Sequence, residues 1–264
     1  MTTVTDVFLY IFSTLFATAL WVYVYRNRSF TFLATAMFFP SLFAIAVHVY
    51  RGTLISFIDF LFFHPQWSTL YWSIFASLSP IIIVFLCCLL NYVFGWGVFR
   101  KQSMSISSIH EHNQNMLYGW LRAMGEEIGW RSFLLPNLLI HFHPIIALNI
   151  SGIVWGLYHV PVMILLCTHP KFKVQHPIRT IVVQCLSCWI SAFVFGWIAI
   201  QAEYSFLPAT MEHFIWNRIN PLVLGSIYTN TPGWMLGEQW KINGEGLIGC
   251  IVYFFLTLLV VFSL

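Results

Sequence analysis

Long apolar stretches constrain the fold of this chain more than any other feature. A helix spans a bilayer with about 20 consecutive, mostly apolar residues. Eight stretches fit that length: residues 5–25, 30–50, 69–98, 117–140, 144–166, 179–202, 206–224 and 246–263. Charged residues make up only 8% of the chain, against about 25% in soluble domains, so lipid must cover part of the surface. We predict an all-α, polytopic integral membrane protein with about eight transmembrane helices, as a single membrane domain over residues 1–264.

The lysines and arginines between these stretches predict one orientation. Arg51 falls on one side of the membrane, and eight basic residues fall on the other. The eight are Arg26, Arg28, Arg100, Lys101, Lys171, Lys173, Arg179 and Lys241. Because cytoplasmic loops carry the excess of Lys and Arg, both termini are expected outside the cytoplasm. The membrane would be the plasma membrane in a bacterium or the endoplasmic reticulum in a eukaryote. No basic stretch is long enough to indicate nucleic acid binding.

The four middle stretches carry ionisable side chains, which are costly inside a membrane and usually serve function. In residues 117–140, Glu127 and Arg131 lie four residues apart, so they share a helix face and are expected to pair. Glu126 points about 100° away from Glu127 around the helix. We therefore expect Glu127 to be neutralised within the helix, and Glu126 to face a cavity in the interior of the bundle.

His159 is expected beside Glu126. The turn between residues 117–140 and 144–166 is short, so these two helices are predicted to be antiparallel neighbours. Glu126 lies about 24 Å before that turn and His159 about 25 Å after it, at about 1.5 Å per residue. A carboxylate and an imidazole at one depth form a general-base arrangement.

A second histidine follows in residues 206–224. His213 and Asn217 are four residues apart and share a helix face. Both side chains can donate hydrogen bonds to a developing oxyanion. From its place near the start of the stretch, His213 would lie nearer the outer side than Glu126, unless a loop at Pro208 dips inward. The predicted catalytic core is residues 117–220.

Two other patterns indicate structure rather than chemistry. His110, Glu111 and His112 lack the H-E-x-x-H spacing of a metal site and fall in a polar loop. Cys185 and Cys188 form a C-x-x-C pair inside an apolar stretch, where packing is the more common role.

Three motifs resemble the CAAX prenyl endopeptidase and bacteriocin-processing (CPBP) family of membrane proteases. The first is the string EEIGWRSFLLP, which begins at Glu126. The second is LYHVP around His159, with Trp155 in a place where that family often has phenylalanine. The third is HFIWN, from His213 to Asn217. The resemblance covers about residues 117–220, and the first motif is the most specific.

The resemblance implies an intramembrane endopeptidase. Its substrate would be a membrane-anchored, CAAX-like peptide or protein, prenylated or not. The implied catalytic residues are Glu126 and His159 for water activation and His213 and Asn217 for the oxyanion, with Glu127 and Arg131 as structural support. The family has been described both as metal-dependent and as a family of glutamate proteases. With a metal, Glu126, His159 and His213 would hold zinc; a water held by Glu126 and His159 alone needs fewer assumptions.

Two other classes of protein stay open. Ionisable groups inside a membrane also line transporters and ion pathways, although the sequence shows no inverted repeat of the transporter type. The other alternative is a non-enzymatic immunity or scaffold protein of the same fold. A degenerate member is expected to have lost at least one of the four implied catalytic groups, and all four are present.

Overall fold

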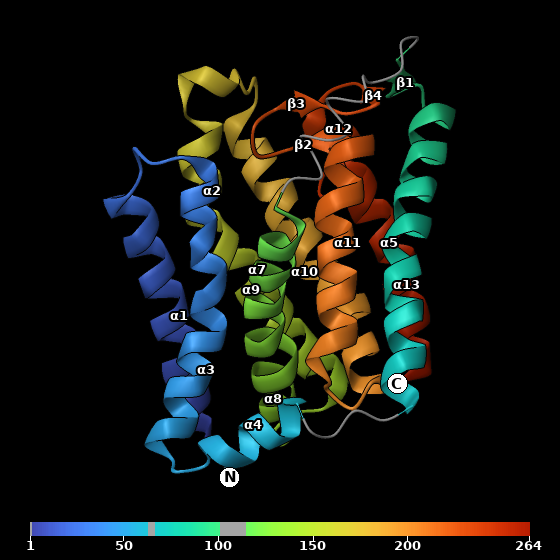
Figure 1. Cartoon of the computed structure of the whole chain (residues 1–264). Helices are drawn as coiled ribbons and strands as arrows, with labels where there is room; N and C mark the ends of the chain where they lie inside the picture. Colours follow the sequence, from blue (N-terminus) through green and yellow to red (C-terminus); the bar gives the residue numbers. More distant parts are fainter. Residues whose placement is uncertain (1, 63–66, 101–114) are drawn as a thin grey trace.

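The computed structural model describes residues 2–62, 67–100 and 115–264. Long helices form one bundle, with short strands at one end and both termini at the other (Figure 1). The helices are α1 (Val4–Val24), α2 (Phe30–Leu33), η1 (Ala34–Phe38), α3 (Phe39–Tyr50), α4 (Leu54–Phe62), α5 (Trp67–Val93), α7 (Met116–Gly129), η2 (Trp130–Leu134), α8 (Leu135–Leu139), α9 (Pro144–Cys167), η3 (Pro170–Phe172), α10 (Pro177–Gln201), α11 (Phe206–Val223), α12 (Gln239–Ile242) and α13 (Leu247–Ser263).

The strands form two antiparallel pairs of two residues each. One pair joins β1 (Val98–Phe99) to β4 (Met235–Leu236), and the other joins β2 (Gly225–Ser226) to β3 (Thr231–Pro232). The first pair ties the end of α5 to the segment before α12, so it closes one end of the bundle (Figure 1).

Six helical stretches of the described residues are long and apolar enough to cross a membrane. They are Val4–Val24, Phe30–Tyr50, Ser68–Val93, Pro144–Cys167, Pro177–Gln201 and Gln239–Ser263. The all-α, multi-pass membrane fold is therefore confirmed, with six stretches rather than eight meeting this test. The other two predicted spans are helical as well, but they carry the charged and polar residues of the site.

One boundary and one additional helix differ from the prediction. The third span was expected to reach residue 98, but α5 ends at Val93 because Gly95 turns the chain with a φ of +67°. The short helix α4 was not expected at all. The polar loop predicted around His110, Glu111 and His112 lies outside the described residues.

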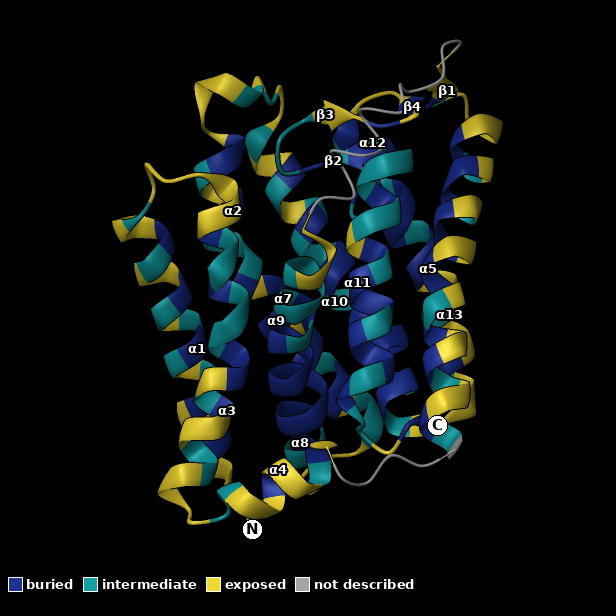
Figure 2. Ribbon diagram, viewed as in Figure 1, coloured by how far each residue is buried: buried dark blue, intermediate teal, exposed yellow. Residues whose placement is uncertain are grey.

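The helix that carries the acidic pair lies in the centre of the bundle. Residues 125–135 are all buried, and they form the dark segment of α7 and η2 in Figure 2. A Cβ on Gly129 would meet the backbone carbon of Pro40 at 2.5 Å and Tyr10 Oη at 2.6 Å. Because glycine permits this close approach, α7 packs directly on α3, and its other side packs on α11.

The helix widens just after the acidic pair. Residues 130–134 form a π-helical turn, and Pro136 follows in the first turn of α8. Proline lacks an N–H, and in an α-helix its ring clashes with the carbonyl four residues earlier. The wider turn relieves that clash, and π turns often occur at functional sites.

Candidate active site

A buried ion pair occupies the end of α7. Arg131 Nη1 lies 3.2 Å from Glu127 Oε1, and the two side chains are 1% and 0% exposed. This confirms the pair predicted from their spacing of four residues. The guanidinium of Arg131 also lies 4.3 Å from the centre of the Trp155 ring. The aromatic ring and the carboxylate together stabilise the positive charge of Arg131, which is no longer hydrated.

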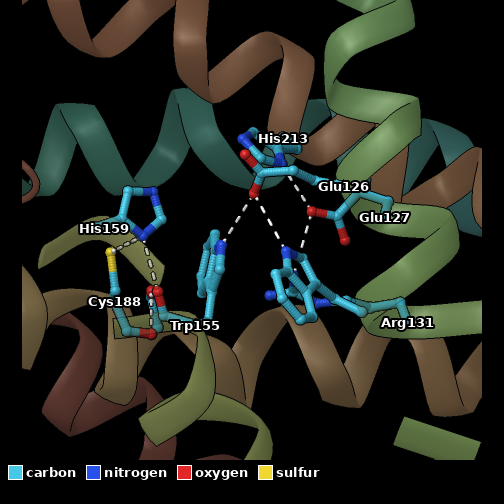
Figure 3. Close-up of polar contacts among 9 residues, drawn as sticks. Glu126, Glu127, Arg131, Trp155, His159, Cys188 and His213 are labelled. Carbon is cyan, nitrogen blue, oxygen red and sulfur yellow. Dashed lines mark hydrogen bonds and ion pairs between the residues drawn. The ribbon is translucent and has the colours of Figure 1, made fainter. Parts of the chain in front are cut away.

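His213 extends this pair into a chain of three residues. Its Nδ1 lies 2.6 Å from the same Glu127 Oε1 that accepts from Arg131 (Figure 3). A carboxylate on one ring nitrogen fixes the orientation of an imidazole and leaves the other nitrogen for chemistry. The depth conflict raised by the sequence therefore disappears, because α11 brings His213 level with the acidic pair.

Glu126 is covered by two indole rings. Its Oε2 accepts hydrogen bonds from Trp130 Nε1 at 3.3 Å and from Trp155 Nε1 at 3.1 Å. Glu126 is 2% exposed. The sequence predicted that this carboxylate would face a cavity; in the structure it lies behind Trp155, which separates it from the cavity.

His159 lies on the other side of Trp155 from Glu126 in the view of Figure 3. Its Nδ1 is 2.8 Å from the carbonyl oxygen of Trp155 and 3.8 Å from Cys188 Sγ. The predicted neighbours are thus linked through one residue: the Trp155 indole donates to Glu126, and its backbone carbonyl accepts from the imidazole. That bond places the proton on Nδ1 and leaves Nε2 of His159 free to accept.

A small cavity adjoins these groups. Its volume is about 30 Å³, which is room for about two water molecules. His159, His213 and Asn217 line it, together with Trp155. Three of the four predicted catalytic residues therefore share one cavity, and the fourth, Glu126, is hydrogen-bonded to its wall.

A different trio from the predicted one lies close enough together to hold a metal ion. One ligand atom from each of Glu126, Glu127 and His213 lies within 4.8 Å of the others. Glu127 thus takes the place that the sequence gave to His159. Among the described residues, Glu127 Oε2 has no hydrogen-bond partner although it is buried. Two carboxylates and an imidazole are a suitable donor set for zinc, so these residues fit a divalent cation.

The cavity also involves residues that the sequence analysis missed. Glu245 and Tyr253 line it from the C-terminal part of the chain, beyond the predicted core of residues 117–220. Glu245 sits in the short polar segment Asn243–Gly246 just before an apolar helix, where a solvated turn is the usual expectation. The one indication in the sequence that Glu245 could join the site was the position of this carboxylate within two residues of a predicted span.

These features define a class: a multi-pass membrane protein with a carboxylate–histidine site buried in its helix bundle, as in an intramembrane hydrolase. Residues 114–219 match the family described as type II CAAX prenyl endopeptidase Rce1-like. The matched segment contains all six residues singled out from the sequence, which confirms the predicted resemblance. No curated protein matches the chain. The family match implies a peptidase.

Proposed function

We propose that this protein is an intramembrane endopeptidase that hydrolyses a peptide bond of a membrane-associated substrate. One observation carries the proposal: Glu126, Glu127 and His213 are brought together within 4.8 Å, inside the bundle and within the family match. Ionisable groups buried in a membrane protein are rare and usually mark a functional site. The family description supports a CAAX-like substrate, prenylated or not.

Water activation is assigned to Glu126 and His159. Glu126 accepts the proton of a water molecule held between it and the free Nε2 of His159, and the hydroxide attacks the peptide carbonyl. When the tetrahedral intermediate collapses, the C–N bond breaks and Glu126 returns the proton to the leaving amine. Trp155 separates the two groups in this structure, so its ring must shift enough to admit this water while its N–H stays hydrogen-bonded to Glu126. A positioned general base contributes about 10²–10⁴-fold to rate.

Oxyanion stabilisation is assigned to His213 and Asn217. Both line the cavity from one face of α11, so both can donate to an oxygen at its centre. Glu127 holds His213 by its Nδ1, and Arg131 holds Glu127 in turn. Removing one such donor from an oxyanion site costs about 10²–10³-fold in kcat.

A metal ion would be held by Glu126, Glu127 and His213. Bound there, it would act as a Lewis acid and lower the barrier to deprotonating water. The protein would supply two carboxylates and one imidazole as ligands. Arg131 and the two indole N–H groups would fix the orientations of the carboxylates.

The experiment is proteolysis of quenched fluorescent peptides anchored in proteoliposomes, with farnesylated and unmodified versions compared. Glu126→Gln should reduce cleavage by at least about 10²-fold. Glu238→Gln is the control: this glutamate is exposed, pairs with Lys241 and is not among the residues that line the cavity. Its cleavage rate should stay within about threefold of wild type.

The outcomes separate the alternatives. Loss of cleavage with a chelator and recovery with zinc would assign the metal-dependent mechanism, whereas resistance to chelation would assign the metal-free one. Equal activity of Glu126→Gln and the parent would refute the catalytic assignment. No cleavage of any peptide, together with ion flux that Glu126→Gln abolishes, would assign a transport function instead.

A further inference from the structure

Glu245 is a carboxylate at the cavity for which the proposed hydrolysis has no use. It lies between α12 and α13, and it lines the same cavity as His159, His213 and Asn217. Its side chain is only partly buried, in contrast to Glu126 and Glu127. It is therefore the acidic group that a substrate meets in the cavity.

The backbone around Glu245 is held rigidly. Asn220 Oδ1 accepts from the Gly244 N–H at 3.0 Å, and Asn243 Oδ1 accepts from the Glu245 N–H at 2.9 Å. A Cβ on Gly244 would meet Trp216 Cη2 at 2.5 Å, so the turn is pressed against α11. A carboxylate fixed in this way is preorganised, and a ligand need not order it on binding.

The protein partners of this carboxylate are all neutral. Trp216 Nε1 donates to its Oε1 at 3.2 Å, and Gln184 Nε2 donates to its Oε2 at 3.5 Å. Tyr228 is the third neighbour; burial and then the Glu245 charge raise the pKa of Tyr228 well above its usual value, so its hydroxyl stays neutral and donates. Neutral donors orient a carboxylate but leave its charge in place.

No positive side chain is paired with Glu245 in the part of the chain that the structure describes. Glu127 and Glu238 differ in this respect, since Arg131 pairs with Glu127 and Lys241 pairs with Glu238. The start of α13 offers a partial positive charge, but a helix N-terminus carries only about half an elementary charge and does not neutralise a carboxylate. A partly desolvated carboxylate without a cation is costly, and a cationic ligand would remove that cost.

We propose that Glu245 binds a primary ammonium group of the substrate, so that the enzyme prefers a peptide with lysine next to the scissile bond. The inference rests on the proposed peptidase function and names part of its substrate class. An ammonium is a compact point charge with three donors, and its head has about the size of a water molecule. The cavity of about 30 Å³ admits it more readily than the planar guanidinium of arginine.

The test uses one membrane-anchored peptide in which the residues flanking the scissile bond are changed singly to lysine, norleucine or glutamate. For the wild-type protein, kcat/KM should be at least about 10-fold higher with lysine than with norleucine at one position, as a buried charge pair would give. In Glu245→Gln this preference should vanish, while cleavage of the norleucine peptide is kept. Glutamine keeps the size of the side chain and one of its two acceptor oxygens, and the circular dichroism spectrum checks that the fold is kept.

Glu238→Gln is the matched control. This glutamate is exposed, lies near Glu245 in the sequence and pairs with Lys241, so its loss should leave the lysine preference intact. A separate readout is binding of labelled lysine and norleucine peptides to Glu126→Gln protein, measured by fluorescence polarisation. Tighter binding of the lysine peptide, abolished by adding Glu245→Gln, would support the proposal even without turnover.

Two results would overturn it. One is equal cleavage or equal binding of the lysine and norleucine peptides by the protein with Glu245. The other is a lysine preference that survives Glu245→Gln. By contrast, absence of cleavage with any peptide would count against the peptidase function, and the binding measurement would still decide the role of Glu245.

Discussion

Replacing Arg131 by methionine tests whether the buried ion pair holds the site together. Arg131 is 1% exposed and Glu127 is fully buried, so the change leaves a buried carboxylate with His213 as its remaining partner. Removing one partner of a buried pair costs about 3–5 kcal/mol. The cation–π contact with Trp155 at 4.3 Å is lost as well. We expect the free energy of unfolding to fall by at least about 3 kcal/mol.

The assay is unfolding in mixed micelles as the fraction of SDS is raised, followed by circular dichroism. Four proteins are compared: wild type, Arg131→Met, Glu127→Gln and the double variant. Because the two side chains contact one another, their effects should not add, and the double variant should lose at least about 1 kcal/mol less than the sum. Arg131→Lys, which keeps the charge but not the planar fork, should fall between wild type and methionine.

The reasoning fails if Arg131→Met costs less than about 1 kcal/mol, a value typical of an exposed pair. It also fails if the two losses add, because the pair would then have no coupling energy. In either case Glu127 would be compensated by another group, and His213 would be the first candidate.

Two further predictions concern Trp155 and Gly129. Trp155→Phe removes the indole N–H that donates to Glu126 and keeps an aromatic ring at that position. We expect kcat for the anchored peptides to fall about 10-fold with little change in KM, because one hydrogen bond to a charged group contributes about 1.5–3 kcal/mol. Gly129→Ala would place a methyl group against Pro40; we expect a loss of about 1–3 kcal/mol in the same SDS titration, as for overpacked cores.

Each of these variants has a control elsewhere in the chain. Trp189→Phe also removes an indole N–H, the one that donates to Asn149, so an equal loss of kcat there would deny Trp155 a specific role. Gly119→Ala adds the same methyl group where the nearest atom, of Phe214, lies 3.6 Å away, and it should be tolerated. If Gly119→Ala and Gly129→Ala lost the same stability, the close approach of α7 to α3 would not be the cause.

Local features of the sequence were sufficient for the fold class and for one part of the site. The apolar stretches depend only on the length of a span and on the solvent around it, so they predicted the membrane helices within a few residues. The pairing of Glu127 with Arg131 follows from helix periodicity, which needs no tertiary contact. The motif spacing was enough to indicate the family.

The tertiary structure decided which groups meet across helices. His213 reaches Glu127 although the two are 86 residues apart, and Trp155 comes between Glu126 and His159, where sequence depth alone had placed them side by side. Successive residues are about 100° apart around a helix. Contacts between side chains of different helices therefore depend on how the helices are rotated and packed, which no local pattern encodes. For the same reason Glu245, from beyond the predicted core, joined the cavity only when α13 packed against α10.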